Sequence, residues 1–326
     1  GIISVTLAES GYKIIALVAF YLIREVTIGT LVVVFSPTYP TLRFDTETAL
    51  DVLIFGKSIV LSKLLSVSEE RGDDYVFGTV AGPTILGNYS IAWKISSTFR
   101  AVIQPVINQG VAPTFANLRE DREGSRDALE FLLRTQLILA VPFYGIVAVT
   151  APVVIPFVFG PRWAGMIPLL QVLTVAGALY PAIHTLGRVH HSRGTARSFV
   201  RTQLLYIPAM LAGIVVGYKL GGPLGATTAV SISGISGFLI GSYFISDEVG
   251  LSLGRVLRPL VVPLGATIGA CLIVQFIIIP KTGPFVATSS ATLLITTTFI
   301  LSVILERNHI LINDISRFCA ALSDTE

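Results

Sequence analysis

The sequence predicts an all-α, polytopic helical membrane protein with about nine transmembrane helices. Its mean hydropathy is +0.76 and only 13% of its residues are charged. Nine apolar stretches each have about the length that crosses a bilayer. Because hydrocarbon offers no water to backbone groups, such stretches must be helices or barrel strands, and the short, alternating pattern of barrel strands is not seen. The nine are Ile14–Ser36, Leu50–Ser68, Leu86–Val111, Ala128–Thr150, Gly165–Leu186, Phe199–Tyr218, Pro223–Ile245, Leu257–Ile279 and Phe285–Leu305.

Proline, charge and tryptophan mark the connections between these helices, in order along the chain. Pro37 and Pro40 end the first span. The acidic stretch Ser68–Asp74 predicts an interruption after the second. Asn117–Asp127 is dense in charge and predicts a solvated turn after the third. Trp163 then supplies an aromatic anchor at the membrane surface before the fifth.

The basic residues fall mainly in alternate loops. Since loops rich in Arg and Lys face the cytoplasm, we expect this side and the carboxyl terminus to be cytoplasmic. Each basic loop is short and lacks interleaved aromatic residues, so we expect no nucleic-acid partner. The cytoplasmic set is Arg43, Arg119, Arg122, Arg126, Arg188, Arg193, Arg197, Arg255, Arg258, Arg307 and Arg317, and the outer set is Arg71, Arg162, Lys219 and Lys281.

Ionisable residues inside the first two spans are costly in a bilayer and are therefore candidate functional residues. Arg24 and Glu25 lie in the middle of the first span. As neighbours on a helix they are predicted to point to different faces and to need partners elsewhere. Lys57 lies in the second span beside serines spaced four apart. The alternative for Lys57 is that it extends to the membrane interface.

The third span carries a polar stripe, which predicts a cationic cavity. With 3.6 residues per turn, the stripe covers about half of the helix surface, which a lipid-facing helix would not show. Arg and Lys bind phosphate oxygens, so the cavity suits a diphosphate and sugar head group. The alternative is that Arg100 pairs with a structural carboxylate. The stripe is Lys94, Ser97, Thr98, Arg100, Gln104 and Asn108, and the candidate substrate-binding residues are Lys94, Arg100, Gln104, Asn108, Lys57 and Arg24.

No motif for covalent chemistry is found, and we expect no enzyme activity, catalytic residue, metal or cofactor. His184, His190 and His191 are the only histidines close enough in sequence to suggest a metal site. The last two lie in a basic loop, so solvated histidines are the expected interpretation.

Several sequence stretches together resemble the Wzx-type polysaccharide flippases of the multidrug/oligosaccharidyl-lipid/polysaccharide exporter superfamily. They are SPTYPTLRFD, IFGK, GDDYVFGTVAGPTILGNYSIAWKIS, VAPTFANLRED and VFGPRWAGMIPLLQVLTVAG. The resemblance extends over residues 10–190 and rests on hydropathy beyond them. The positions that fit the family pattern are Asp73, Gly82, Gly87, Tyr89, Pro113, Phe159, Gly160 and Trp163.

The resemblance implies two six-helix lobes around a central cavity, often with two additional helices. On that scheme residues 1–36 are a remnant of the amino-terminal lobe, 37–248 the carboxyl-terminal lobe, 249–305 two additional helices and 306–326 an amphipathic cytoplasmic tail. The expected partners are membrane lipids, a lipid-linked oligosaccharide and the missing amino-terminal lobe of the same protein.

The resemblance implies a flippase that moves a polyprenyl-diphosphate-linked oligosaccharide across the cytoplasmic membrane. One alternative is a multidrug or cation exporter of the same superfamily, which should place carboxylates in its cavity. A second is a membrane polysaccharide polymerase, which needs a large outer loop with catalytic residues.

Overall fold

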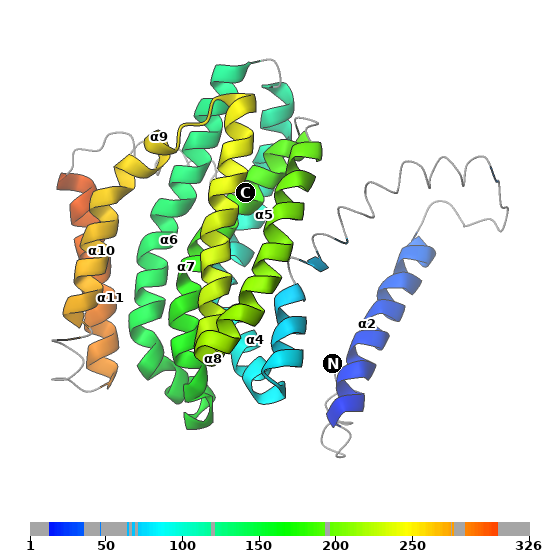
Figure 1. Cartoon of the computed structure of the whole chain (residues 1–326), viewed down its shortest axis with the longest axis vertical. Helices are drawn as coiled ribbons and strands as arrows, with labels where there is room; N and C mark the ends of the chain where they lie inside the picture. Colours follow the sequence, from blue (N-terminus) through cyan, green and yellow to red (C-terminus); the bar gives the residue numbers. More distant parts are fainter. Residues whose placement is uncertain are drawn as a thin grey trace. The chain divides into compact units, whose positions relative to one another are not determined.

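A computed structural model describes residues 13–35, 46, 64, 67–68, 71–118, 121–192, 196–274, 276 and 284–305. The chain forms two compact units, Gly1–Ile59 and Val60–Glu326. Every regular element among the described residues is a helix, as Figure 1 shows. The prediction of an all-α, polytopic membrane protein is therefore confirmed.

The described part of the first unit is dominated by helix α2, Lys13–Phe35. Its 23 residues span about 35 Å at 1.5 Å per residue, enough to cross a bilayer. It contains no proline or glycine pair that would break it, and its apolar side chains are exposed, as expected of a helix surrounded by lipid. The predicted span Ile14–Ser36 is confirmed as a helix.

The second unit is a bundle arranged around α7, which packs against α4, α5, α6 and α8. Helices α10 and α11 pack together against α6, at the side of the bundle (Figure 1). Two clusters of buried apolar side chains fill the bundle, one around Leu133 and the other around Leu173. The elements are α4 Pro83–Ser96, α5 Thr98–Asn117, α6 Arg122–Phe159, η1 Pro161–Met166, α7 Ile167–Ser192, α8 Ala196–Val249, α9 Leu253–Leu257, η2 Arg258–Leu260, α10 Val261–Ile273 and α11 Pro284–Leu305.

Four helical segments of the described chain are long and apolar enough to cross a membrane: Val18–Phe35, Arg122–Phe159, Pro161–His190 and Gln203–Val249. Shorter apolar helices cover Val261–Ile273 and Thr288–Leu301. The predicted span Leu50–Ser68 lies mostly outside the described residues.

Helix α8 contains two predicted spans, which are separated at Gly221 and Gly222. Gly222 has φ +60°, a backbone conformation that favours glycine, and Pro223 restarts the helix. The two halves then pack backbone to backbone, because a Cβ on Gly217 would lie 2.4 Å from the carbonyl oxygen of Gly225. The break that the sequence predicts between Tyr218 and Pro223 is therefore confirmed.

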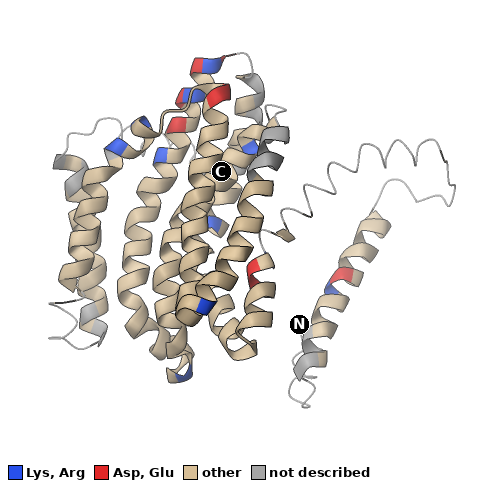
Figure 2. Cartoon of the chain, viewed as in Figure 1, with Lys and Arg blue, Asp and Glu red and all other residues tan. Residues whose placement is uncertain are grey.

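One end of the second unit gathers most of its charged residues, as Figure 2 shows. Arg122 Nη2 donates to the Asp247 carbonyl oxygen at 3.0 Å, and the Ser252 N–H donates to Glu130 Oε1 at 3.2 Å. These bonds join the start of α6 to the end of α8 and the segment after it. Within the described residues, the segments around Arg122 and Arg255, both predicted to be cytoplasmic, thus meet at one end of the bundle.

His190 and Ser68–Asp74 both differ from the prediction. His190 is only 1% exposed, and its Nδ1 lies 3.5 Å from Glu248 Oε1, so it is an interhelical partner and not a solvated residue. Residues 71–80 are helical, and the chain turns at Ala81–Gly82, where Gly82 has φ +83°. Asp73 and Asp74 therefore lie on a helix, and so does Arg71, which was predicted to lie in an outer loop.

The topology can be tested with single cysteines in a background in which Cys271 and Cys319 are serine. Glu123 at the charged end and Ala164 at the opposite end are both exposed. We expect an impermeant maleimide added from outside to label Ala164→Cys and not Glu123→Cys, because basic loops stay in the cytoplasm.

Equal labelling of the two variants, or labelling of Glu123→Cys alone, would contradict this orientation. Ser125 in the same loop is unsuitable, since it is buried and its hydroxyl donates to the Leu118 carbonyl.

Candidate functional site

The polar stripe of the third span lies where α4 meets α5, at Ser97. Ser97 keeps helical dihedral angles, and its N–H donates to the Trp93 carbonyl at 2.8 Å, so the chain continues in nearly the same direction. Ser96 holds this junction against α7, because its hydroxyl donates to the Leu173 carbonyl at 2.8 Å. Tyr144 of α6 donates to the Ser96 carbonyl. Side chains just before and after Ser97 are thereby fixed relative to α7.

Gly177 lets α7 approach the junction closely. A Cβ at this position would lie 2.5 Å from Ser96 Oγ, 2.7 Å from the Ser96 carbonyl oxygen and 2.7 Å from Tyr144 Cε1. Real Cβ atoms do not come so near, so the approach requires glycine. Small residues allow helices in lipid to pack at such distances.

Arg100 of α5 contacts His184 of α7, with Nη1 2.9 Å from His184 Nε2. A guanidinium can only donate, so His184 Nε2 accepts and the imidazole is neutral. The contact therefore orients Arg100 without cancelling its positive charge. The sequence left a carboxylate partner for Arg100 as an alternative, and the partner in this contact is a histidine.

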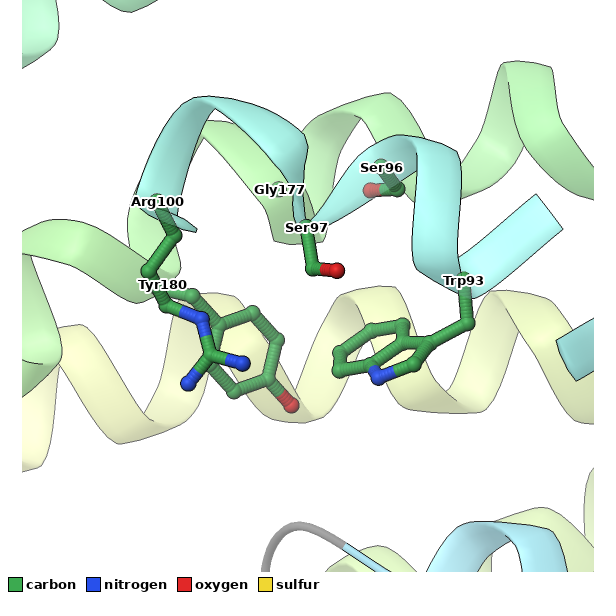
Figure 3. A pocket seen from close by; sticks show the side chains of 6 residues that line it. All are labelled: Trp93, Ser96, Ser97, Arg100, Gly177 and Tyr180. Carbon is green, nitrogen blue, oxygen red and sulfur yellow. The ribbon is translucent and has the colours of Figure 1, made fainter. Parts of the chain in front are cut away.

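A small recess opens beside this contact. Figure 3 shows Arg100 and Tyr180 at one end of it and Trp93 at the other, with the Ser97 hydroxyl between them. Its lining comes from α4, α5 and α7 and consists of Trp93, Ser96, Ser97, Arg100, Gly177 and Tyr180. The recess combines a cation, a hydroxyl and two aromatic rings.

A ladder of aromatic rings supports the recess. The Trp93 and Tyr180 rings meet edge to face at 5.1 Å, and Tyr89 stacks on Phe77 at 3.9 Å, one turn before Trp93. The Tyr180 hydroxyl lies 3.0 Å from that of Tyr206 on α8. The recess walls are thus continuous with the buried core.

A buried carboxylate anchors the far end of this ladder. Tyr89 donates its hydroxyl to Asp73 Oδ2 at 2.6 Å, and the Asp74 N–H donates to Asp73 Oδ1 at 2.8 Å. Ser90 bonds Asp74 at 2.9 Å, and Arg71 forms an ion pair with Asp74 at 3.6 Å. Two residues of the family pattern, Asp73 and Tyr89, therefore form one hydrogen-bonded pair between adjacent helices.

The structure brings only some of the predicted site residues together. Arg100 lines the recess, whereas Lys94 is exposed on α4 and Gln104 is half-buried one turn beyond Arg100. The side chain of Asn108 and the whole of Lys57 lie outside the described residues.

Arg24 belongs to the first unit, where it forms a 3.4 Å ion pair with its neighbour Glu25. The prediction that these two residues point apart is wrong, because their long side chains bend toward each other around the helix. Both are more than half exposed.

Sequence analysis missed Trp93, Tyr180 and His184 as members of the site. A histidine inside the apolar run Gly165–Leu186 is a usable signal, since a polar side chain in a span needs a partner. The two aromatic residues give no such signal, because aromatic residues are common in spans. Among the described residues, no group of three or more His, Cys, Asp or Glu is arranged to hold a metal ion.

The chain is similar to proteins that are named for polysaccharide biosynthesis. Residues 1–168 match the family model described as polysaccharide biosynthesis protein. The lipopolysaccharide biosynthesis protein WzxC of Escherichia coli is 26% identical over 210 residues, covering 63% of this chain and 42% of WzxC. The teichuronic acid biosynthesis protein TuaB of Bacillus subtilis is 26% identical over 232 residues, covering 69% of this chain and 47% of TuaB.

A third relative, the amylovoran biosynthesis protein AmsL of Erwinia amylovora, is 25% identical over 179 residues. That match covers 54% of this chain and 44% of AmsL. The matched region thus spans less than half the length of each of these three relatives. No solved structure gives a significant match.

The closeness of α7 to the α4–α5 junction can be tested with a pair of glycine substitutions. Gly177→Ala should destabilise the chain by about 1–3 kcal/mol, because the added methyl meets Ser96 and Tyr144. Gly87→Ala on α4, where a Cβ meets nothing within 4 Å, should be neutral or stabilising by about 0.5–1 kcal/mol. Apparent melting temperatures in detergent measure both, and equal shifts would mean that Gly177 is not a tight contact.

Proposed function

We infer that this chain, which belongs to the family of polysaccharide biosynthesis proteins, is part of a lipid-linked oligosaccharide flippase. It moves a polyprenyl-diphosphate-linked oligosaccharide from the cytoplasmic to the outer leaflet of the cytoplasmic membrane, and no bond is made or broken. The biosynthetic roles named for its relatives support this, as do its apolar helices.

The observation that carries the proposal is the pairing of Arg100 with a neutral histidine. Placing a cation inside a membrane bundle costs free energy, so such a residue is a candidate functional residue. His184 accepts a hydrogen bond from the guanidinium and orients it beside the recess. Arg100 therefore binds the diphosphate, since phosphate oxygens accept hydrogen bonds from the planar guanidinium. Lys94 adds a second cation six residues earlier, on α4.

The aromatic rings of the recess complement this charge. The indole of Trp93 and the phenol of Tyr180 offer apolar surface with a polar edge, which suits a sugar ring with an apolar face and a rim of hydroxyls. The Ser97 hydroxyl donates to the Lys94 carbonyl at 3.0 Å and can still accept a hydrogen bond. The sugar nearest the diphosphate packs here.

The recess is much smaller than a lipid-linked oligosaccharide head group, so it forms one part of a larger binding surface. In the proposed arrangement residues 37–248 are one lobe of an exporter and the opposite lobe supplies the facing wall. Rocking of one lobe against the other then exposes the cavity to each side of the membrane in turn. The lining residues include a cation and no carboxylate, which argues against a cation exporter.

Export of lipid-linked sugar by cells that supply both lobes tests the proposal. Arg100→Gln should lower the export rate about tenfold or more, because a charged hydrogen bond is worth about 1.5–3 kcal/mol. Lys94→Gln should lower it less, and Arg100→Glu should be worse than Arg100→Gln, because it repels phosphate. Arg162→Gln, which removes an exposed cation at the opposite end of the bundle, should export normally.

His184 supplies a matched pair of variants. His184→Gln keeps a hydrogen-bond acceptor for Arg100 and should retain export, whereas His184→Phe removes it and should not. Full export by the Lys94→Gln, Arg100→Gln double variant, at normal membrane abundance, would show that these cations are structural.

A further inference from the structure

A second hollow lies on the opposite side of α7 from the aromatic ladder, between α6, α7, α8 and α10. Its volume is about 500 Å³, and its lining is almost wholly apolar. A water molecule needs about 30 Å³ and two or more polar partners, so water alone does not fill such a groove. Leu137, Val141, Val175, Leu264 and Leu272 are among the residues that line it.

The few polar side chains in this groove are already hydrogen-bonded to backbone carbonyl groups. Thr174 donates to Gln171 at 2.7 Å, and Thr267 donates to Pro263 at 2.8 Å. Tyr144 donates to Ser96. The groove therefore presents hydrocarbon and offers no donor to a polar ligand, so its ligand is a hydrocarbon chain.

The mouth of the groove lies at the charged end of the bundle. Leu257 of α9 and Leu260 of η2 line it there, and the same short segment carries Arg255 and Arg258. Both arginines are exposed, whereas Val256 between them is fully buried. Being three residues apart, the arginines lie on one side of the segment. Two exposed cations therefore lie on the short segment that lines this end of the groove.

The length of the groove matches one leaflet. From Leu257 to Leu272 the chain advances about 20 Å, and the hydrocarbon of one leaflet is about 15 Å thick. A chain that enters beside Arg255 therefore reaches the middle of the membrane before the groove ends.

We propose that this groove is a binding site for an anionic phospholipid of the leaflet at the charged end. One acyl chain lies along α10 against Val141 and Leu264, and the phosphate binds Arg255 and Arg258. The lipid fills the space between α10 and the rest of the bundle. It also contacts the ring of Tyr144, whose hydroxyl holds the junction beside the recess. The inference rests on the groove and its two arginines and stands apart from the proposed transport function.

Native mass spectrometry of the delipidated chain tests the proposal. The probes are phosphatidylglycerol and phosphatidylcholine with identical acyl chains. We expect one phosphatidylglycerol to be retained in preference to phosphatidylcholine. Each arginine near a head group with a net negative charge contributes about a fivefold preference over the zwitterionic lipid, so Arg255→Gln, Arg258→Gln should reduce it about 25-fold. Arg162→Gln, an exposed arginine at the other end, should leave the preference unchanged.

A second variant tests the groove itself. Val175 lines it and is 45% exposed, so Val175→Trp should fill the groove without disturbing the core and should lower retention of both lipids. Equal retention of the two lipids by the unmodified chain would overturn the proposal. So would an unchanged preference in the double arginine variant. Undecaprenyl diphosphate serves as a third, competing probe, and its retention in place of phosphatidylglycerol would assign the groove to the carrier lipid and overturn the proposal as well.

Discussion

The close approach of α7 to the α4–α5 junction determines the geometry of the recess. Lipid tails are about as apolar as leucine side chains, so apolar contact alone does not hold helices together in a bilayer. Such helices associate through close packing and hydrogen bonds. Gly177 provides the packing, and Ser96 provides the hydrogen bonds, donating to Leu173 and accepting from Tyr144. Trp93 and Arg100, just before and after the junction, are held in place as a result.

Charged groups inside the bundle are likewise held by contacts with other helices. Two buried ionisable groups of the bundle have a partner on another helix: Asp73 accepts from Tyr89, and His190 contacts Glu248. Arg100 contacts the neutral His184. This contact orients the guanidinium beside two aromatic rings, and the proposed phosphate site depends on that orientation.

Sequence reasoning succeeded where the signal was local. The apolar runs predicted the helices, and the gap between the runs Phe199–Tyr218 and Pro223–Ile245 predicted the break in α8. It failed where an outcome depended on residues distant in sequence. Nothing near Arg100 indicates that its partner lies 84 residues later.

Local patterns also misled in two places. The acidic stretch Ser68–Asp74 looks like a loop, yet Asp73 is stabilised inside a helix by Tyr89 from the next helix. Arg24 and Glu25 are adjacent in sequence, which suggests divergent side chains, yet both are long enough to meet. The hydrogen bond from Tyr89 explains the first case, and the length of the two side chains explains the second. Neither can be inferred from spacing along the sequence.

Photo-crosslinking tests the central claim, that the recess binds the sugar diphosphate, most directly. The probe is a polyprenyl-diphosphate disaccharide with a photoreactive group on its first sugar, irradiated in membranes and followed by peptide mass spectrometry. The account predicts crosslinks to the segment from Trp93 to Gln104 and to the part of α7 around Tyr180, both abolished by excess undecaprenyl diphosphate. Crosslinks confined to α10 and α11, with none at either segment, would contradict it.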